Sequence, residues 1–224
     1  MKKNIIAFIP ARGGSKRIKA KNLQKINGKS LVFLTAKQAL NTKIFQDIYL
    51  SSDSKKILDE CKNQNVKILE RRKNLSKDKS LIEEVLIDFL NSYNIKARYL
   101  VLMQPTSPLR SVNTIKKFIK FCLKNKLKKC LTVSEIHDQI SEKKKKFKSL
   151  SNYKIRRTQE RKVYLFENSL LYFVDIKYFL KTKTLYEKNW PYYITNKYES
   201  LDINNKEDLE IARKLMKNEN NKNK

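Results

Sequence analysis

A short loop near the amino terminus, residues 10–16, has the composition of a phosphate-binding turn. Its sequence is Pro-Ala-Arg-Gly-Gly-Ser-Lys. Two adjacent glycines, Gly13 and Gly14, allow the backbone to approach a ligand closely and to turn N–H groups toward it. The positive charge that a triphosphate requires comes from three side chains on or just after the loop: Arg12, Lys16 and Lys21.

The loop matches neither of the two standard phosphate motifs, the P-loop and the G-x-G-x-x-G pattern. Short basic loops that contain glycine are common, and a flexible loop after an edge strand would have the same composition. Taken alone, the residues leave both interpretations open.

The elements around this loop follow a strand–helix alternation over the first 135 residues. Short apolar, β-branched runs predict buried strands at residues 5–9, 48–50, 66–69, 99–103 and 130–134. Helical spacing of apolar residues predicts helices at residues 31–40, 55–63, 82–93 and 115–123. This alternation is typical of a three-layer α/β domain with parallel crossovers, whose ligands bind at the carboxyl ends of the strands.

The second half of the chain departs from this rhythm. Residues 136–162 are polar and strongly basic, and they indicate an excursion from the core; a strand is expected again over 164–173. Asn205 is a good helix N-cap, with Asp208 at the third helical position of a final helix. We expect one domain over residues 1–217 and a disordered polar tail over 218–224.

The chain is very basic, with 51 Lys and Arg against 22 Asp and Glu and a formal net charge of +29. Such a charge usually suggests nucleic acid or an anionic membrane. Most of the basic residues are lysine, however, and lysine, asparagine and isoleucine are abundant together, as an A/T-rich genome would produce. We therefore attribute the high positive charge to compositional bias and not to a polyanion partner, although a basic surface would still attract a triphosphate.

The three cysteines, Cys61, Cys122 and Cys130, lack metal-ligand spacing, which indicates reduced and mostly buried thiols. The apolar run at residues 5–9 is too short for a signal peptide, and no run is long enough to cross a membrane. We therefore expect a soluble, cytoplasmic protein.

Residues 9–16 with Lys21 and Asn22 form the first of several motifs that occur in order along the chain. They are similar to the opening signature of the acylneuraminate cytidylyltransferase (CMP-N-acetylneuraminic acid synthetase) family. Further matches follow in order at residues 28–31, 50–53, 102–110 and 200–203, and residues 157–172 resemble the segment that returns from the lid to the sheet. The resemblance spans about residues 5–213. It implies a three-layer α/β/α sandwich with a Rossmann-like, mostly parallel sheet of the nucleotide-diphospho-sugar transferase type, with residues 136–162 as a small lid or dimerisation excursion.

The resemblance also implies roles for individual residues. For CTP binding it implies the first-loop and neighbouring residues Arg12, Gly13, Gly14, Ser15, Lys16, Lys21, Asn22, Arg71 and Ser80. For the acidic sugar it implies Gln104, Arg157 and Gln159, and for catalysis Arg157, Lys21 and Asp202. His137, the one histidine, lies far from these motifs in the sequence and is not expected to be catalytic.

Asp202 matches a Mg²⁺ ligand of the family, and a hard cation of this kind prefers oxygen ligands. The family has a second aspartate two residues later, where this chain has Asn204. An amide oxygen can still ligate Mg²⁺, but the site loses one negative charge. A second departure from the family pattern is Ser169, which stands where the family usually has glycine. We expect a metal site formed by Asp202 and Asn204.

The resemblance implies transfer of CMP from CTP to the anomeric hydroxyl of a sialic-acid-like nonulosonic acid, with release of pyrophosphate. Legionaminate, pseudaminate and 3-deoxy-manno-octulosonate are alternative acceptors, although the octulosonate enzymes lack the Gly-Gly-Ser-Lys form of the first loop. A non-enzyme alternative is a basic nucleic-acid-binding protein on the same scaffold. The resemblance further implies a homodimer in which the 136–162 region reaches toward the partner's site.

Overall fold

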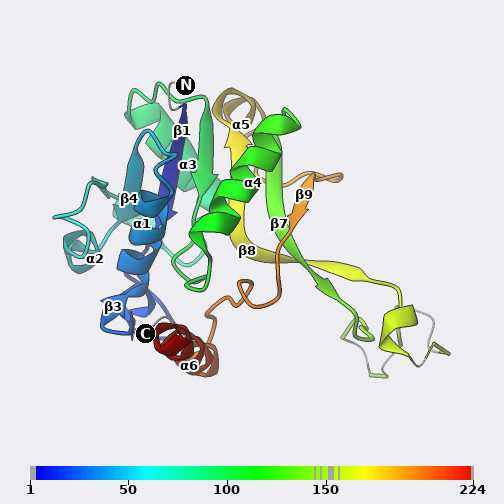
Figure 1. The fold of residues 1–224 in the computed structure, drawn as a ribbon. Helices are drawn as coiled ribbons and strands as arrows, with labels where there is room; N and C mark the ends of the chain where they lie inside the picture. Colours follow the sequence, from blue (N-terminus) through cyan, green and yellow to red (C-terminus); the bar gives the residue numbers. More distant parts are fainter. Residues whose placement is uncertain (1–3, 144, 147, 151–153, 156, 223–224) are drawn as a thin grey trace.

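A seven-stranded sheet forms the centre of the computed structural model, which describes residues 4–222 apart from 144, 147, 151–153 and 156 (Figure 1). The strand order is β5-β4-β1-β6-β8-β7-β9. The bounds are β1 Ile5–Pro10, β4 Ile48–Ser52, β5 Lys67–Glu70, β6 Tyr99–Leu102, β7 Lys129–Ile136, β8 Tyr164–Asp175 and β9 Tyr192–Ile194. Among these described strands only β8 runs antiparallel to its neighbours β6 and β7, so the expected mostly parallel sheet is confirmed.

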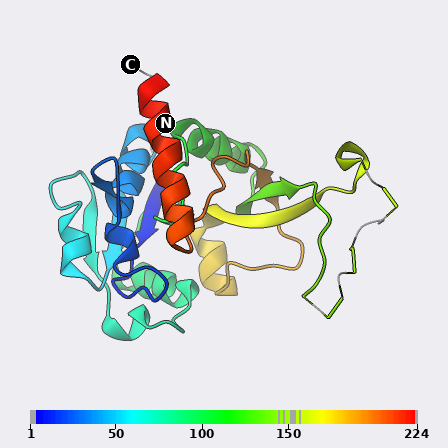
Figure 2. The ribbon, with the colours of Figure 1, turned by 90° about the horizontal axis from the view of Figure 1, so that it is seen from below.

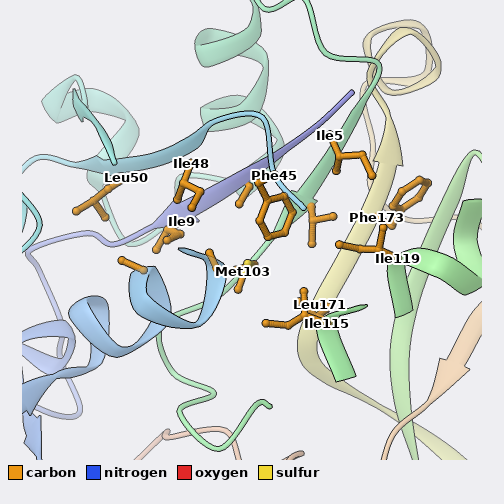
Figure 3. Close-up of a cluster of buried hydrophobic side chains, with 14 of the residues drawn as sticks. Ile5, Ile9, Phe45, Ile48, Leu50, Met103, Ile115, Ile119, Leu171 and Phe173 are labelled. Atoms are coloured by element: carbon orange, nitrogen blue, oxygen red, sulfur yellow. The ribbon is translucent and has the colours of Figure 1, made fainter. Parts of the chain in front are cut away.

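Alternate residues of each strand pack against different helices, because successive side chains of a strand point to opposite faces. Ile5 and Ile9 of β1 belong to one buried cluster, and Ile6 and Phe8 to another. On the first face lie α1 (Leu31–Thr42), α2 (Lys55–Asp59) and α4 (Val112–Lys124). Figure 3 shows part of this core, with residues of β1, β4, α4 and β8 labelled. On the second face lie α3 (Ile82–Ser92) and α5 (Ile176–Thr182). The predicted α/β/α sandwich is therefore correct.

Most element bounds agree closely with the sequence prediction. The helix expected over 55–63 ends at Asp59 as α2. The residues that follow, 60–65, are polar except for Cys61 and contain two asparagines, which favour turns over helix. The sequence also did not predict α5, β9, the short hairpin of β2 (Lys25–Ile26) and β3 (Lys29–Ser30), or the short 3-10 helices.

The end of β7 and the start of β8 form a two-stranded arm that extends away from the sandwich (Figures 1 and 2). Their pairing continues as far as Ile136 opposite Tyr164. At its far end the described residues contain one 3-10 helix, η3 (Thr158–Glu160). The expected excursion thus lies at the tip of this arm, remote from the carboxyl ends of β1 and β4.

The final helix, α6 (Lys206–Lys222), fastens the carboxyl-terminal part of the chain to the amino-terminal loop. Its start is capped reciprocally, because the Asn205 side chain accepts from the Asp208 N–H at 2.8 Å and the Asp208 carboxylate accepts from the Asn205 N–H at 3.0 Å. Ile203 packs with Ile18 in a small apolar cluster that also contains Ile26, Leu31, Leu209 and Ala212. The helix continues to Lys222, into the stretch where we expected a polar tail; a helix already capped and packed at its start can propagate through polar residues.

Other expectations concern the cysteines and the membrane. All three cysteines are buried and free of disulfides. Within the described part of the chain, no helix combines the length and apolar character needed to cross a membrane.

Candidate active site

A cavity of about 570 Å³ lies at the carboxyl ends of β1 and β6, between the first loop and the segment after β5. This is the edge of the sheet at which parallel α/β folds bind ligands. Most residues that we expected to bind the nucleotide line it, together with the expected sugar-binding amide: Arg12, Gly14, Ser15, Lys16, Lys21, Asn22, Arg71, Ser80 and Gln104. The fold therefore brings together residues up to 92 positions apart in the sequence, from Arg12 to Gln104.

The two glycines of the first loop have different surroundings. Gly13 does not line the cavity; its N–H donates to the Asp53 carboxylate at 2.8 Å. A Cβ atom at Gly13 would lie 2.9 Å from the Cβ of Ser54, whereas one at Gly14 would have no heavy atom within 4 Å. Gly13 is thus required for close contact between the loop and the residues after β4, and only Gly14 faces the ligand space.

We expect Gly13→Ala to lower the free energy of unfolding by about 1–3 kcal/mol, because the added methyl group must push two backbone segments apart. Gly14→Ala is the matched control and should change the stability by less than about 0.5 kcal/mol. Urea denaturation followed by circular dichroism measures both. Equal effects of the two substitutions on the free energy of unfolding would show that the close contact with Ser54 does not make Gly13 necessary.

Arg71 is held in place at the back of the cavity. Its guanidinium donates to the Ser51 carbonyl at 2.9 Å and to the Ser51 hydroxyl at 3.2 Å. Burial lowers the pKa of Arg71 to about 10, opposed by the nearby Asp53 carboxylate, so the side chain remains a cation at neutral pH. Across the cavity, the Ser80 hydroxyl donates to the Asn74 carbonyl at 3.0 Å.

The turn that carries Gln104 is fixed by Arg110, a side chain for which the sequence predicted no role. Arg110 is 1% exposed and donates to the Gln104 carbonyl at 3.4 Å and to the Leu170 carbonyl at 2.7 Å. Burial lowers the pKa of Arg110 to about 9, opposed by the charge of Glu199. Arg110 therefore ties the end of β6 to β8 and positions Gln104 without facing the cavity.

Lys21 joins the cavity to the segment that carries Asp202. Its ammonium donates to the Ile203 carbonyl at 2.8 Å. Burial lowers the pKa of Lys21, and the adjacent Asp202 carboxylate opposes that shift. Asp202 itself lines a second cavity, of about 420 Å³, with Lys197 and Ser169 among its other walls. Lys21 therefore lies between the first cavity and the segment that lines the second cavity.

The expected metal site has one carboxylate with a free oxygen. The Asn204 side-chain amide donates to one oxygen of Asp202 at 2.8 Å, while the other, Oδ1, is buried without a hydrogen-bond partner among the described residues. A second carboxylate at position 204 could not approach Asp202 this closely without a cation or proton between them. In the described part of the chain no group of three or more His, Cys, Asp or Glu could hold a metal. A Mg²⁺ ion here would depend on Asp202 and on ligand oxygens, which suits a cation that uses only one or two carboxylates.

Ser169, which lines the second cavity, has φ +56°, a conformation in which glycine is favoured. Its hydroxyl lies 3.3 Å from the Tyr172 hydroxyl, which donates its one proton to Glu167. The contact with Tyr172 gives this serine a local partner in a position where the resemblance leads us to expect glycine.

Arg157 and Gln159 are not part of this arrangement within one chain. Both lie on the arm, where Arg157 is 79% exposed and pairs with Glu160 at 3.5 Å. His137 is also at the arm, 3.6 Å from Glu135, and lines neither cavity. The structure thus separates the arm residues from the cavity of about 570 Å³, which we call the nucleotide cavity, and His137 does not line it.

Sequence reasoning missed Asp78, the only carboxylate among the described residues that line the nucleotide cavity. Its oxygens lie 2.9 Å from Arg12 and 2.5 Å from Lys16. A single acidic residue between Lys77 and Lys79, in a stretch otherwise basic, was the signal that could have indicated it.

The fold and the cavity define an α/β protein with a basic cavity at the carboxyl ends of its parallel strands. The sequence profile of the cytidylyltransferase family matches residues 6–223, and the chain belongs to that family.

Three similar proteins illustrate the relationship. The N-acylneuraminate cytidylyltransferase of Streptococcus agalactiae serotype III is 27% identical over 212 residues, 91% of this chain and 51% of that protein. The CMP-N,N'-diacetyllegionaminic acid synthase of Legionella pneumophila is 30% identical over 223 residues, 95% of this chain and 96% of that protein. Among solved structures, a CMP:2-keto-3-deoxy-manno-octonic acid synthetase in complex with CTP superposes with a TM-score of 0.75 at 16% identity, covering 96% of this chain and 99% of the other. The chain spans about half the length of the N-acylneuraminate enzymes that it matches.

Proposed function

We propose that this protein transfers CMP from CTP to the anomeric hydroxyl of an acidic, sialic-acid-like nine-carbon sugar, releasing pyrophosphate. The observation that carries the proposal is the position of Lys21, which lines the nucleotide cavity and contacts the segment of Asp202 through the Ile203 carbonyl. A reaction at the α-phosphorus needs a cation at the boundary between nucleotide and acceptor, and Lys21 occupies such a boundary.

The reaction that we propose needs no covalent enzyme intermediate. The sugar hydroxyl attacks the α-phosphorus, and pyrophosphate leaves on the opposite side. Arg12, Lys16 and Lys21 offset the negative charge that grows on the leaving group, and the amide of Gln104 orients the acceptor. The protein thus contributes to catalysis by positioning the two substrates and by holding preorganised positive charge where negative charge develops.

Asp202 would hold a Mg²⁺ ion through its free buried oxygen, and the family match and the donor set both support this assignment. Bound Mg²⁺ neutralises phosphate charge and orients the triphosphate. In this proposal Asn204 orients the Asp202 carboxylate through its hydrogen bond.

Restoring a carboxylate at residue 204 tests that assignment. We expect Asn204→Asp to lower the Mg²⁺ concentration for half-maximal activity by roughly 3-fold to 10-fold, because the site regains an anionic oxygen ligand. We also expect the variant to be less stable without Mg²⁺, since two carboxylates then face each other unpaired. Thermal denaturation with and without Mg²⁺ measures the second effect independently of activity. An unchanged Mg²⁺ dependence in both measurements would mean that residue 204 does not face the ion.

Four acidic sugars should be compared directly as acceptors. The N-acylneuraminate relatives are about twice as long as this chain, whereas the diacetyllegionaminic acid relative matches it over nearly its full length. The 30% identity to the diacetyllegionaminic acid synthase supports legionaminate as the second candidate acceptor. Pyrophosphate release should be measured at fixed CTP with N-acetylneuraminate, diacetyllegionaminate, pseudaminate and 3-deoxy-manno-octulosonate. A preference for the octulosonate by kcat/KM would overturn the assignment to nine-carbon sugars.

We further propose that the protein acts as a homodimer in which the arm of one copy approaches the acceptor site of the other. Two observations support this. Arg157 and Gln159 line neither cavity of their own chain, and the arm exposes apolar side chains, with Leu150 53% and Val163 41% exposed. Light scattering after gel filtration gives the mass, and a monomer at assay concentration would refute the proposal.

The nucleic-acid-binding alternative receives less support. Cations are gathered around the nucleotide cavity, as expected for a CTP site, and the motifs that follow β1 and β6 both line it. Titration with duplex DNA at rising salt would show a steep loss of affinity if that alternative were correct.

A further inference from the structure

Six cationic side chains line the nucleotide cavity, and one carboxylate among its described lining residues faces them. The cations are Arg12, Lys16, Arg17, Lys21, Arg71 and Lys77, and the carboxylate is that of Asp78. Asp78 does not contact all six. Each of its two oxygens contacts one of the two first-loop cations, Arg12 at 2.9 Å and Lys16 at 2.5 Å.

Asp78 holds two walls of the cavity together. Arg12 and Lys16 belong to the loop after β1, while Asp78 belongs to the segment after η2 (Lys73–Ser76), which also carries Ser80. Arg12 also donates to the Lys77 carbonyl at 3.3 Å. The contact between these walls thus includes, besides the Lys77 carbonyl, a carboxylate placed between cations that we assign to phosphate.

We propose that Asp78 is an internal substitute for nucleotide phosphate: it competes with phosphate for Arg12 and Lys16 and thereby sets how much phosphate charge a ligand must carry to bind. This inference rests on the proposed CTP site. A phosphate oxygen and the Asp78 carboxylate would seek the same N–H donors, and at that distance they would repel each other. A ligand that carries more phosphate charge gains more from displacing the carboxylate, so CTP and pyrophosphate compete with it better than inorganic phosphate does.

The energetics of these pairs suit a reversible exchange. Arg12 and Asp78 are 37% and 41% exposed, and Lys16 is 80% exposed, so water screens both pairs. Lys16 and Arg12 hold the pKa of Asp78 below its usual value, which keeps the carboxylate charged and able to compete at neutral pH. Exposed ion pairs are weak enough for a triphosphate to break them. The pairs of Asp78 with Arg12 and Lys16 can then re-form when pyrophosphate leaves.

The test is the affinity of Asp78→Asn for three ligands, measured by isothermal titration calorimetry: cytidine, pyrophosphate and CTP. We expect pyrophosphate and CTP to bind to Asp78→Asn about 3-fold to 10-fold more tightly than to the wild type, because the variant lacks two exposed ion pairs that compete with phosphate. Cytidine carries no phosphate, so its affinity should not change. Pyrophosphate should also inhibit turnover more strongly in Asp78→Asn.

Asp59→Asn is the matched control, because Asp59 is an exposed carboxylate at the end of α2, outside the cavity, and its loss changes the net charge equally. If Asp59→Asn tightens pyrophosphate binding as much as Asp78→Asn, the effect is one of overall charge and the inference is wrong. Unchanged or weaker pyrophosphate binding by Asp78→Asn would also overturn it, since Asp78 would then only position Arg12. Failure of the wild type to bind CTP would instead contradict the proposed function.

Discussion

Lys21→Ala is expected to lower kcat by about 100-fold or more, comparable to the removal of one preorganised donor from the site of developing charge. Lys21 is partly buried between the nucleotide cavity and the segment of Asp202. Its positive charge acts most strongly when pyrophosphate begins to leave, because the charge on the leaving group is then greatest. The KM for CTP should rise much less than kcat falls. Steady-state pyrophosphate release measures both.

The control for this substitution is Lys19→Ala, which removes an exposed lysine of the same loop. Its kcat should stay close to that of the wild type. Since Lys21 also donates to the Ile203 carbonyl, the thermal stability of Lys21→Ala must be measured as well. A folded Lys21→Ala protein with nearly normal kcat would show that Lys21 belongs only to a solvated basic loop.

Asp202→Ala is expected to abolish detectable activity at ordinary Mg²⁺ concentrations, a fall of roughly 100-fold to 1000-fold. Asp202 supplies the one carboxylate oxygen of the described segment 200–205 that is buried and lacks a protein partner. A slight recovery at very high Mg²⁺ is expected, because the nucleotide phosphates retain ligands of their own for the ion. Activity as a function of Mg²⁺ at saturating CTP measures this.

Glu207→Ala is the matched control for Asp202→Ala, since Glu207 is an exposed carboxylate at the start of α6, a few residues away. It should retain normal Mg²⁺ dependence. Two other carboxylates near the site have structural partners: Asp53 accepts from Gly13, and Asp208 accepts from the Asn204 and Asn205 N–H groups. If Asp202→Ala stays active, the assignment of the metal to Asp202 is wrong, and Asp53 or Asp208 would have to be tested as the ligand.

The fold was predictable because buried strands and amphipathic helices have distinct apolar patterns. The β-branched run at Ile5–Pro10 and the helical stripe of α4 are examples in which pattern and structure agree. The antiparallel direction of β8 could not be read from the sequence in the same way. Strand direction depends on how the chain returns to the sheet, and here it returns from the arm.

The nucleotide cavity was predictable through motifs, since each lies next to the end of a strand. Asp78 and Arg110 escaped prediction for different physical reasons. Arg110 is buried and acts through the backbone of Gln104, so its environment follows only from the packing of β8 against the turn. Asp78 belongs to a segment without regular structure, and its contact with Arg12 joins residues 66 positions apart in the sequence.

The two glycines illustrate a further limit. Their sequence suggested equal roles, but contact with Ser54 gives Gly13 a packing role and leaves Gly14 to the ligand. Such a difference depends on the distance between two loops, which no local pattern contains.

The most direct test of the central claim is pyrophosphate release with CTP, UTP, GTP and ATP, each with Mg²⁺ and the nine-carbon acidic sugar that gives the highest rate. Our proposal predicts release with CTP at a kcat/KM at least about 100-fold above that with UTP, since a site that hydrogen-bonds a base rejects the analogue that leaves those groups unpaired. The reaction mixture should contain the CMP-sugar in amounts equal to the pyrophosphate. Equal turnover of CTP and UTP, or pyrophosphate release that does not depend on the sugar, would contradict CMP transfer as the function of this site.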